Sequence, residues 1–321
     1  MKTVGIIGGA GFIGSYVTRQ FLESGFKVKV SAMDISNKEK YAHLSGLPNA
    51  ANMEIAPLDV QNIDQLKAFA AGCDILVHSG TPFQLEVEDV QRDLLDPTIK
   101  GTENFLQVVS ETPTVKKKVV FIASVAAHNT DFPMPAPGFA PDHVYSEKDK
   151  PYYSQESIPY CQAKYYADQA VRKFTQENPA PGFDIVTVSP VGVMGNQLSG
   201  RGDSTSMGIQ FLFKNKLAPN PFIQMFYDLD VDWALVDVAD VAESVYKAAT
   251  LPNLHGKHYL ITSESYRVSD ISLMLNGKEP VGKPSTVYSN ALATNDLGVH
   301  FKPAKTPLHQ YAEATEGVAA G

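Results

Sequence analysis

The segment VGIIGGAGFIGSYV, residues 4–17, is the feature that most limits how this chain can fold. A short apolar run at residues 3–7 precedes Gly8, Gly11 and Gly14, after which apolar residues recur every fourth position. The run predicts a buried strand, and the period of four predicts a helix. Glycines between a strand and a helix N-terminus let the backbone turn tightly and approach a pyrophosphate. We therefore predict a dinucleotide-binding loop; the alternative is a plain turn between two core elements.

The same alternation of strand and helix continues to about residue 190. Further strands are expected near residues 28–30, 53–56, 75–77, 119–122 and 185–188, and helices at 65–71, 98–109 and 159–174. This order predicts an α/β fold with a Rossmann-type doubly wound parallel sheet. We assign residues 1–190 to a dinucleotide-binding domain. Residues 191–321 form a smaller C-terminal substrate-binding lobe, with about 232–262 returning to the first domain, because the regular alternation breaks after 190.

Composition excludes several functional classes. The chain has 321 residues, 44% of them hydrophobic, and a net charge of −8, which argues against a nucleic-acid or anionic-membrane surface. Two cysteines without paired spacing suggest neither a disulfide framework nor a zinc site, and no metal is expected. No apolar run approaches a membrane span, and no signal peptide is recognisable. We expect a cytoplasmic protein.

A second motif lies far downstream, in PYCQAKYYADQA. Tyr160 and Lys164 are four residues apart on one predicted helix and therefore share a face. An ammonium within about 4–6 Å of a phenol favours the phenolate, so Lys164 should lower the pKa of Tyr160. That would suit Tyr160 to act as a general acid toward a carbonyl oxygen. Ser124 follows the predicted strand at 119–122, where its hydroxyl could bind the same oxygen.

Together these motifs resemble the extended short-chain dehydrogenase/reductase superfamily. The resemblance implies that Ser124, Tyr160 and Lys164 are the catalytic set and that the cofactor is NAD or NADP. VHSGTPF, DPTIKGTENFL, LVDVADVAES and LGVHFKPAKTPLHQ are similar to segments of its dihydroflavonol reductase and cinnamoyl-CoA reductase branch. Thr98 stands where sugar-nucleotide epimerases and dehydratases usually carry an asparagine.

The resemblance also implies a set of residues around the cofactor. They are Gly8, Gly11, Phe12, Ile13, Gly14, Met33, Asp34, Lys40, Asp59, Val60, Ser79, Gly80, Thr81, Tyr160, Lys164, Pro190 and Val193. Reductases of this branch commonly have an arginine where Met33 stands, to bind the 2′-phosphate of NADP. Asp34 would repel that phosphate, whereas Lys40 could attract it, so the balance leans slightly to NAD. Asn129 falls where dihydroflavonol reductases contact their substrate.

We expect an oxidoreductase that transfers a hydride between the nicotinamide and a small apolar or aromatic aldehyde or ketone, as a carbonyl reductase or alcohol dehydrogenase. The alternatives are a sugar-nucleotide epimerase or dehydratase of the same fold and a non-catalytic dinucleotide sensor. The partner is a small-molecule carbonyl or alcohol, and the protein is expected to be a monomer or homodimer. The tripeptide Arg201-Gly202-Asp203 is interpreted as a solvated turn.

Overall fold

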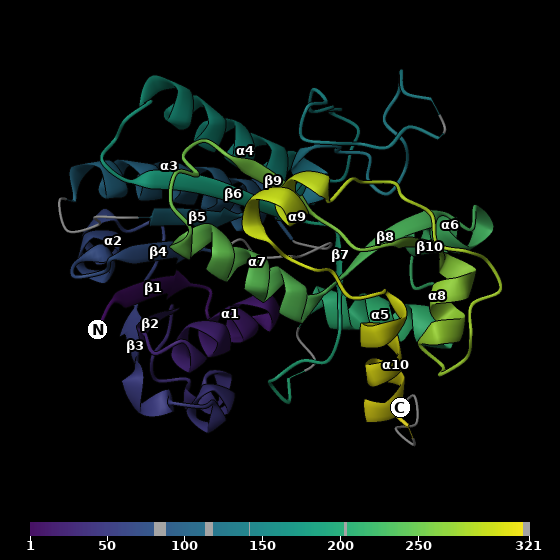
Figure 1. Cartoon of the computed structure of the whole chain (residues 1–321), viewed down its shortest axis with the longest axis horizontal. Coiled ribbons are helices and arrows are strands. Elements are labelled where there is room, and N and C mark those ends of the chain that lie inside the picture. Colours follow the sequence, from purple (N-terminus) through teal and green to yellow (C-terminus); the bar gives the residue numbers. More distant parts are fainter. Residues whose placement is uncertain (80–87, 113–117, 141, 202–203, 317–321) are drawn as a thin grey trace.

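A computed structural model describes residues 1–79, 88–112, 118–140, 142–201 and 204–316. Its central element is a seven-stranded sheet in which every neighbouring pair is parallel (Figure 1). In spatial order the strands are β3 (Met53–Pro57), β2 (Lys27–Ala32), β1 (Thr3–Ile7), β4 (Ile75–His78), β5 (Lys118–Ile122), β6 (Asp184–Pro190) and β9 (His258–Ile261). The chain order reverses between β1 and β4, which is where doubly wound sheets bind ligands. The predicted Rossmann-type fold is confirmed.

Helices cover both faces of this sheet. Helices α1 (Phe12–Glu23) and α7 (Val238–Thr250) contact each other on one face, and α2 (Ile63–Ala70), α3 (Asp96–Glu111) and α4 (Pro159–Glu177) cover the other. Successive strand residues point to opposite faces, so Ile6 is buried in the core beneath α1, whereas Ile7 is buried in the core beneath α2 and α3. None of the helices in the described ranges is long and apolar enough to cross a membrane.

A smaller lobe lies beyond the carboxyl ends of the strands, on the right in Figure 1. It contains a three-stranded sheet of β7 (Gly192–Met194), β8 (Asp232–Asp237) and β10 (Ser265–Arg267), with β8 in the centre. Its helices are α5 (Thr205–Asn215), α6 (Pro221–Asp228), α8 (Val268–Met274) and α10 (Lys305–Ala314), while α9 (Ala291–Leu297) contacts β9 and α7. The segment 232–262, predicted to return to the first domain, therefore begins in the small sheet with β8. Its later part does return, since α7 packs against β5 and β6 and β9 is a strand of the large sheet.

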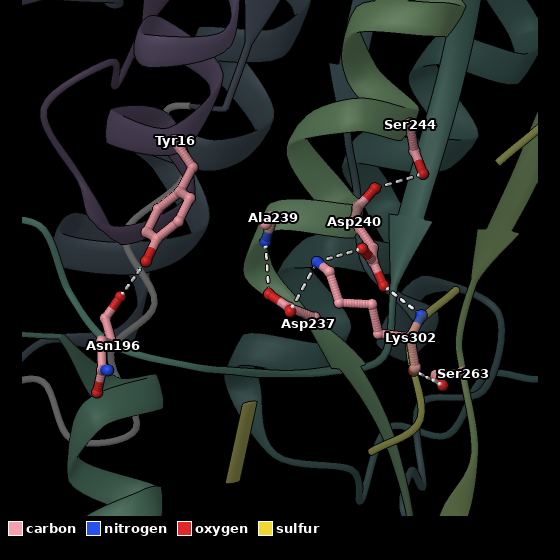
Figure 2. A network of polar contacts seen from close by, with 8 residues as sticks. All are labelled: Tyr16, Asn196, Asp237, Ala239, Asp240, Ser244, Ser263 and Lys302. Carbon is pink, nitrogen blue, oxygen red and sulfur yellow. Dashed lines mark hydrogen bonds and ion pairs between the residues drawn. The ribbon is translucent and has the colours of Figure 1, made fainter. Parts of the chain in front are cut away.

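Polar contacts join the closing segment of the chain to the junction of the two lobes (Figure 2). The Lys302 ammonium lies 2.9 Å from a carboxylate oxygen of Asp237 and 2.8 Å from one of Asp240, and its backbone N–H donates to Asp240 at 2.7 Å. Both carboxylates are nearly inaccessible to solvent, so Lys302 neutralises charge that would otherwise be buried without a partner. Nearby, the Tyr16 hydroxyl of α1 donates to the Asn196 carbonyl oxygen at 2.7 Å.

Candidate active site

The glycine loop has the geometry that a dinucleotide pyrophosphate requires. Gly8 has a φ of +78°, and its carbonyl oxygen accepts a hydrogen bond of 3.0 Å from the Gly11 N–H. A Cβ on Gly14 would lie only 2.0 Å from that same oxygen, so a side chain here would force the turn apart. The first N–H groups of α1 have no partner within the helix and carry the positive end of its dipole. The loop is therefore a cradle for an anionic phosphate.

A cavity of about 670 Å³ extends from this loop to the small lobe. Most of the residues predicted to bind the cofactor line it. They are Gly8, Gly11, Phe12, Ile13, Gly14, Met33, Lys40, Asp59, Val60, Ser79, Tyr160, Lys164, Pro190 and Val193. Gly80 and Thr81 lie outside the described residues. Asp34 is not one of the lining residues, and its carboxylate instead accepts hydrogen bonds from Ser36.

Ser124, Tyr160 and Lys164 meet in this cavity although they come from distant parts of the chain. Ser124 stands two residues beyond β5, and its hydroxyl oxygen accepts a hydrogen bond of 3.2 Å from the Ala126 N–H. Tyr160 is the second residue of α4, and Lys164 follows one turn later, with its ammonium 5.8 Å from the centre of the Tyr160 ring. The carboxyl end of β5 and the N-terminus of α4 thus place a hydroxyl, a phenol and an amine at one point.

Burial determines the protonation of this group. It raises the pKa of Tyr160 well above its usual value, with a smaller contribution from Cys161, while a hydrogen bond with Ser124 acts in the opposite direction. It also lowers the pKa of Lys164 to about 8. The pKa of Tyr160 is therefore raised overall, opposite to the lowering that its spacing from Lys164 predicts, because the loss of solvent dominates. A raised pKa keeps Tyr160 protonated at neutral pH, as a proton donor requires.

A chain of polar contacts that sequence analysis does not predict links α4 to the sheet. Arg172 donates from Nε to Asp168 at 2.5 Å, and one of its terminal nitrogens contacts Nδ1 of His258 in β9. The second ring nitrogen of His258 lies 2.8 Å from the Ser189 hydroxyl of β6. Burial lowers the pKa of His258 well below its usual value and raises that of Asp168. These contacts tie α4 to the sheet, and so they hold Tyr160 and Lys164 in position.

The far wall of the cavity is largely apolar and comes from the small lobe and the loop after β5. It includes Phe132, Ile158, Ile209, Phe222 and Trp233. These side chains line the same cavity as the catalytic group, so the cavity suits a small apolar or aromatic molecule.

Asn129, the residue predicted to contact the substrate, lies in the loop after β5. It is buried, and its amide nitrogen donates to the Met134 carbonyl oxygen at 2.8 Å while its amide oxygen accepts from the Asp131 N–H at 3.0 Å. Asn129 is not one of the described residues that line the cavity. These contacts stabilise the loop after β5, and contact between Asn129 and a substrate stays a prediction.

Known proteins with similar sequences and structures are consistent with this site. Residues 4–262 match the model of the NAD dependent epimerase/dehydratase family. A cinnamoyl-CoA reductase of Medicago truncatula is 27% identical over 98% of this chain and 95% of its own length, and an anthocyanidin reductase of Vitis vinifera is 26% identical over 90% and 84%. Gre2 of Candida albicans in complex with NADPH superposes with a TM-score of 0.79 at 23% identity, covering 98% of both chains. The chain belongs to the NAD dependent epimerase/dehydratase family, as an oxidoreductase that uses a nicotinamide dinucleotide.

Proposed function

We propose that the protein is a carbonyl reductase or alcohol dehydrogenase that acts on a small apolar or aromatic aldehyde or ketone. The observation that carries this proposal is the meeting of Ser124, Tyr160 and Lys164 in a cavity that aromatic and aliphatic side chains also line. The names of its relatives, which include cinnamoyl-CoA reductase and anthocyanidin reductase, support reduction of a carbonyl group beside an aromatic system.

A nicotinamide dinucleotide held by the glycine loop, Pro190 and Val193 would supply the hydride for the carbonyl carbon. Tyr160 gives its phenolic proton to the carbonyl oxygen, so that one hydride and one proton together convert the carbonyl to an alcohol. Ser124 donates a hydrogen bond to the same oxygen and orients it. Lys164 lies beside the Tyr160 ring, where its positive charge stabilises the phenolate left after proton transfer. In the oxidative direction Tyr160 removes the alcohol proton.

The test compares Tyr160→Phe with the wild-type protein. Loss of a general acid costs about 10²–10⁴-fold in rate, whereas the ring packing and the dinucleotide affinity should be nearly unchanged. Consumption of NADH and of NADPH is followed against a panel of aldehydes, ketones and UDP-sugars. Tyr166→Phe is a matched control, because Tyr166 lies on the same helix, is exposed and has a hydroxyl 2.8 Å from that of Tyr153.

Retention of more than about a tenth of the wild-type rate by Tyr160→Phe would contradict the proposed mechanism. Turnover of UDP-sugars without reduction of any aldehyde or ketone would favour the epimerase or dehydratase alternative. Tight dinucleotide binding without turnover of any compound would favour the sensor. The cytoplasmic location and the monomeric or homodimeric state stay predictions.

A further inference from the structure

Arg201, which sequence analysis assigned to a solvated turn, reaches from the small lobe to the cofactor loops. It precedes α5 and lines the cavity. Its guanidinium donates to the carbonyl oxygen of Ala10, in the glycine loop, at 3.3 Å, and to the carbonyl oxygen of Lys40, in the loop after β2. A cation of the small lobe is thus held against the glycine loop, which binds the pyrophosphate in this fold, and against the loop after β2, which lies next to the adenosine ribose.

The loop after β2 presents a different charge to the cavity from the one its sequence indicates. Met33 lines the cavity and is 77% exposed, so it supplies surface without charge. The Asp34 carboxylate accepts hydrogen bonds from the Ser36 N–H at 2.9 Å and from the Ser36 hydroxyl at 2.6 Å. It therefore closes its own turn and is not one of the described residues that line the cavity. Contact between Asp34 and the ribose, and the slight lean to NAD that rests on it, stay predictions.

Two cations remain at this end of the cavity, Lys40 and Arg201, and both line it. We infer that they form a binding site for the 2′-phosphate of NADPH, with Arg201 of the small lobe in place of the arginine that Met33 lacks. This inference rests on the proposed function, because it concerns the cofactor of the same site.

The chemistry of the two residues supports a phosphate as the ligand. A guanidinium has five N–H donors in one plane, so one group can bind backbone carbonyl oxygens and a phosphate at the same time. The pyrophosphate has its own partners in the glycine loop and the N-terminus of α1. The contact with the Lys40 carbonyl places Arg201 instead beside the loop after β2, which lies next to the adenosine ribose in Rossmann folds. NADH has a hydroxyl in place of the 2′-phosphate, so it presents no anion to the two cations at this position.

The test measures binding rather than turnover, by isothermal titration with 2′,5′-ADP and with 5′-AMP, which differ only in the 2′-phosphate. Loss of one charge-assisted hydrogen bond corresponds to about a ten- to hundredfold loss of affinity. Arg201→Met and Lys40→Met should each weaken the binding of 2′,5′-ADP by that factor and change the affinity for 5′-AMP less than twofold. Arg201→Lys should recover part of the loss. Lys38→Met is the matched control, because Lys38 is exposed in the same loop and is not a lining residue.

Titrations with NADPH and NADH then extend the comparison to the whole cofactor. Equal weakening of both fragments by Arg201→Met would overturn the inference, since it would assign Arg201 to the pyrophosphate or to loop structure. Unchanged affinities for both fragments would overturn it as well. Wild-type protein that binds neither fragment nor either dinucleotide would contradict the proposed function itself. Urea unfolding midpoints of the variants establish that each one is folded.

Discussion

Replacing Lys164 by methionine should stabilise the protein at neutral pH and abolish its catalytic activity. Lys164 is 7% exposed, and burial lowers its pKa from 10.5 to about 8. A shift of that size corresponds to a penalty of about 3 kcal/mol for keeping the ammonium charged in the folded protein. Methionine has a chain of similar length without the charge, and loses only the ammonium contact with the Tyr160 ring, worth about 0.5–1 kcal/mol. The expected net gain is about 2–3 kcal/mol.

The pH dependence of this gain distinguishes charge burial from better packing. Between about pH 8 and 10.5 the unfolded chain keeps the Lys164 proton while the folded protein releases it. Stability of the wild type therefore rises with pH through this window, and the penalty is fully present only below it. The advantage of Lys164→Met should be largest at pH 7 and should shrink by pH 10.

The assay is urea unfolding of the wild type and Lys164→Met, followed by circular dichroism from pH 7 to 10. Lys173→Met is the control, because Lys173 lies on the same helix with a side chain 74% exposed. Its effect should stay within about 0.5 kcal/mol at every pH. A Lys164→Met protein that is less stable than the wild type at pH 7, or whose advantage is the same at pH 7 and pH 10, would refute this reasoning.

Two further predictions concern the small lobe and its attachment. Phe222→Ala should change the ranking of carbonyl substrates, because Phe222 lines the cavity. Phe226→Ala should instead lower the free energy of unfolding by about 3–5 kcal/mol, because Phe226 is fully buried in the lobe core. Kinetics on a substrate panel and urea unfolding separate the two effects, and an unchanged substrate ranking for Phe222→Ala would place the specificity pocket elsewhere. Lys302→Met should cost about 2–3 kcal/mol in urea unfolding, less than the 3–5 kcal/mol of a fully buried pair because its side chain is 42% exposed. The exposed Lys305→Met serves as its control, and equal effects of the two variants would contradict the role assigned to Lys302.

Elements with a local sequence signature could be predicted. The apolar run at residues 3–7 forms β1 over the expected residues, and the apolar period after the glycines forms α1. Helix α4 was expected at 159–174 and extends to Glu177, with Pro159 at its first turn, where the missing N–H costs nothing. In each case the residues that define the element are neighbours in the chain, so their pattern is visible without knowledge of the fold.

The three-stranded sheet of the small lobe has no such signature. β7 and β10 contain only three residues each, and their partners are far away in the sequence: Gly192 pairs with Leu235, and Ser265 with Ala234. Short strands whose pairing is entirely long-range resemble irregular chain, so the sequence shows only a break in the regular alternation after residue 190. The helices between these strands are not predicted either, because glycine, proline and aromatic residues obscure their apolar period.

Side-chain direction was the other property that the sequence could not supply. Asp34 and Met33 are adjacent, yet only Met33 lines the cavity, because the carboxylate of Asp34 bonds to Ser36. Asn129 is in the expected loop but turns its amide to the backbone of that loop. The raised pKa of Tyr160 likewise depends on burial, which a spacing of four residues cannot indicate.

Residues of the Rossmann domain and residues of the small lobe both line the cavity, so substitutions in the two parts should affect different properties of the enzyme. The Rossmann domain contributes the glycine loop, which follows β1, and Tyr160 and Lys164, which lie on α4. The small-lobe wall carries Phe222 beside the substrate space and Arg201 beside the cofactor loops. Substrate preference and cofactor preference should then both respond to substitutions in the small lobe while the proton-transfer group is unaltered. Because Arg201 bonds across to the loop after β2, an occupied 2′-phosphate site would also hold the small lobe against the Rossmann domain during the reaction.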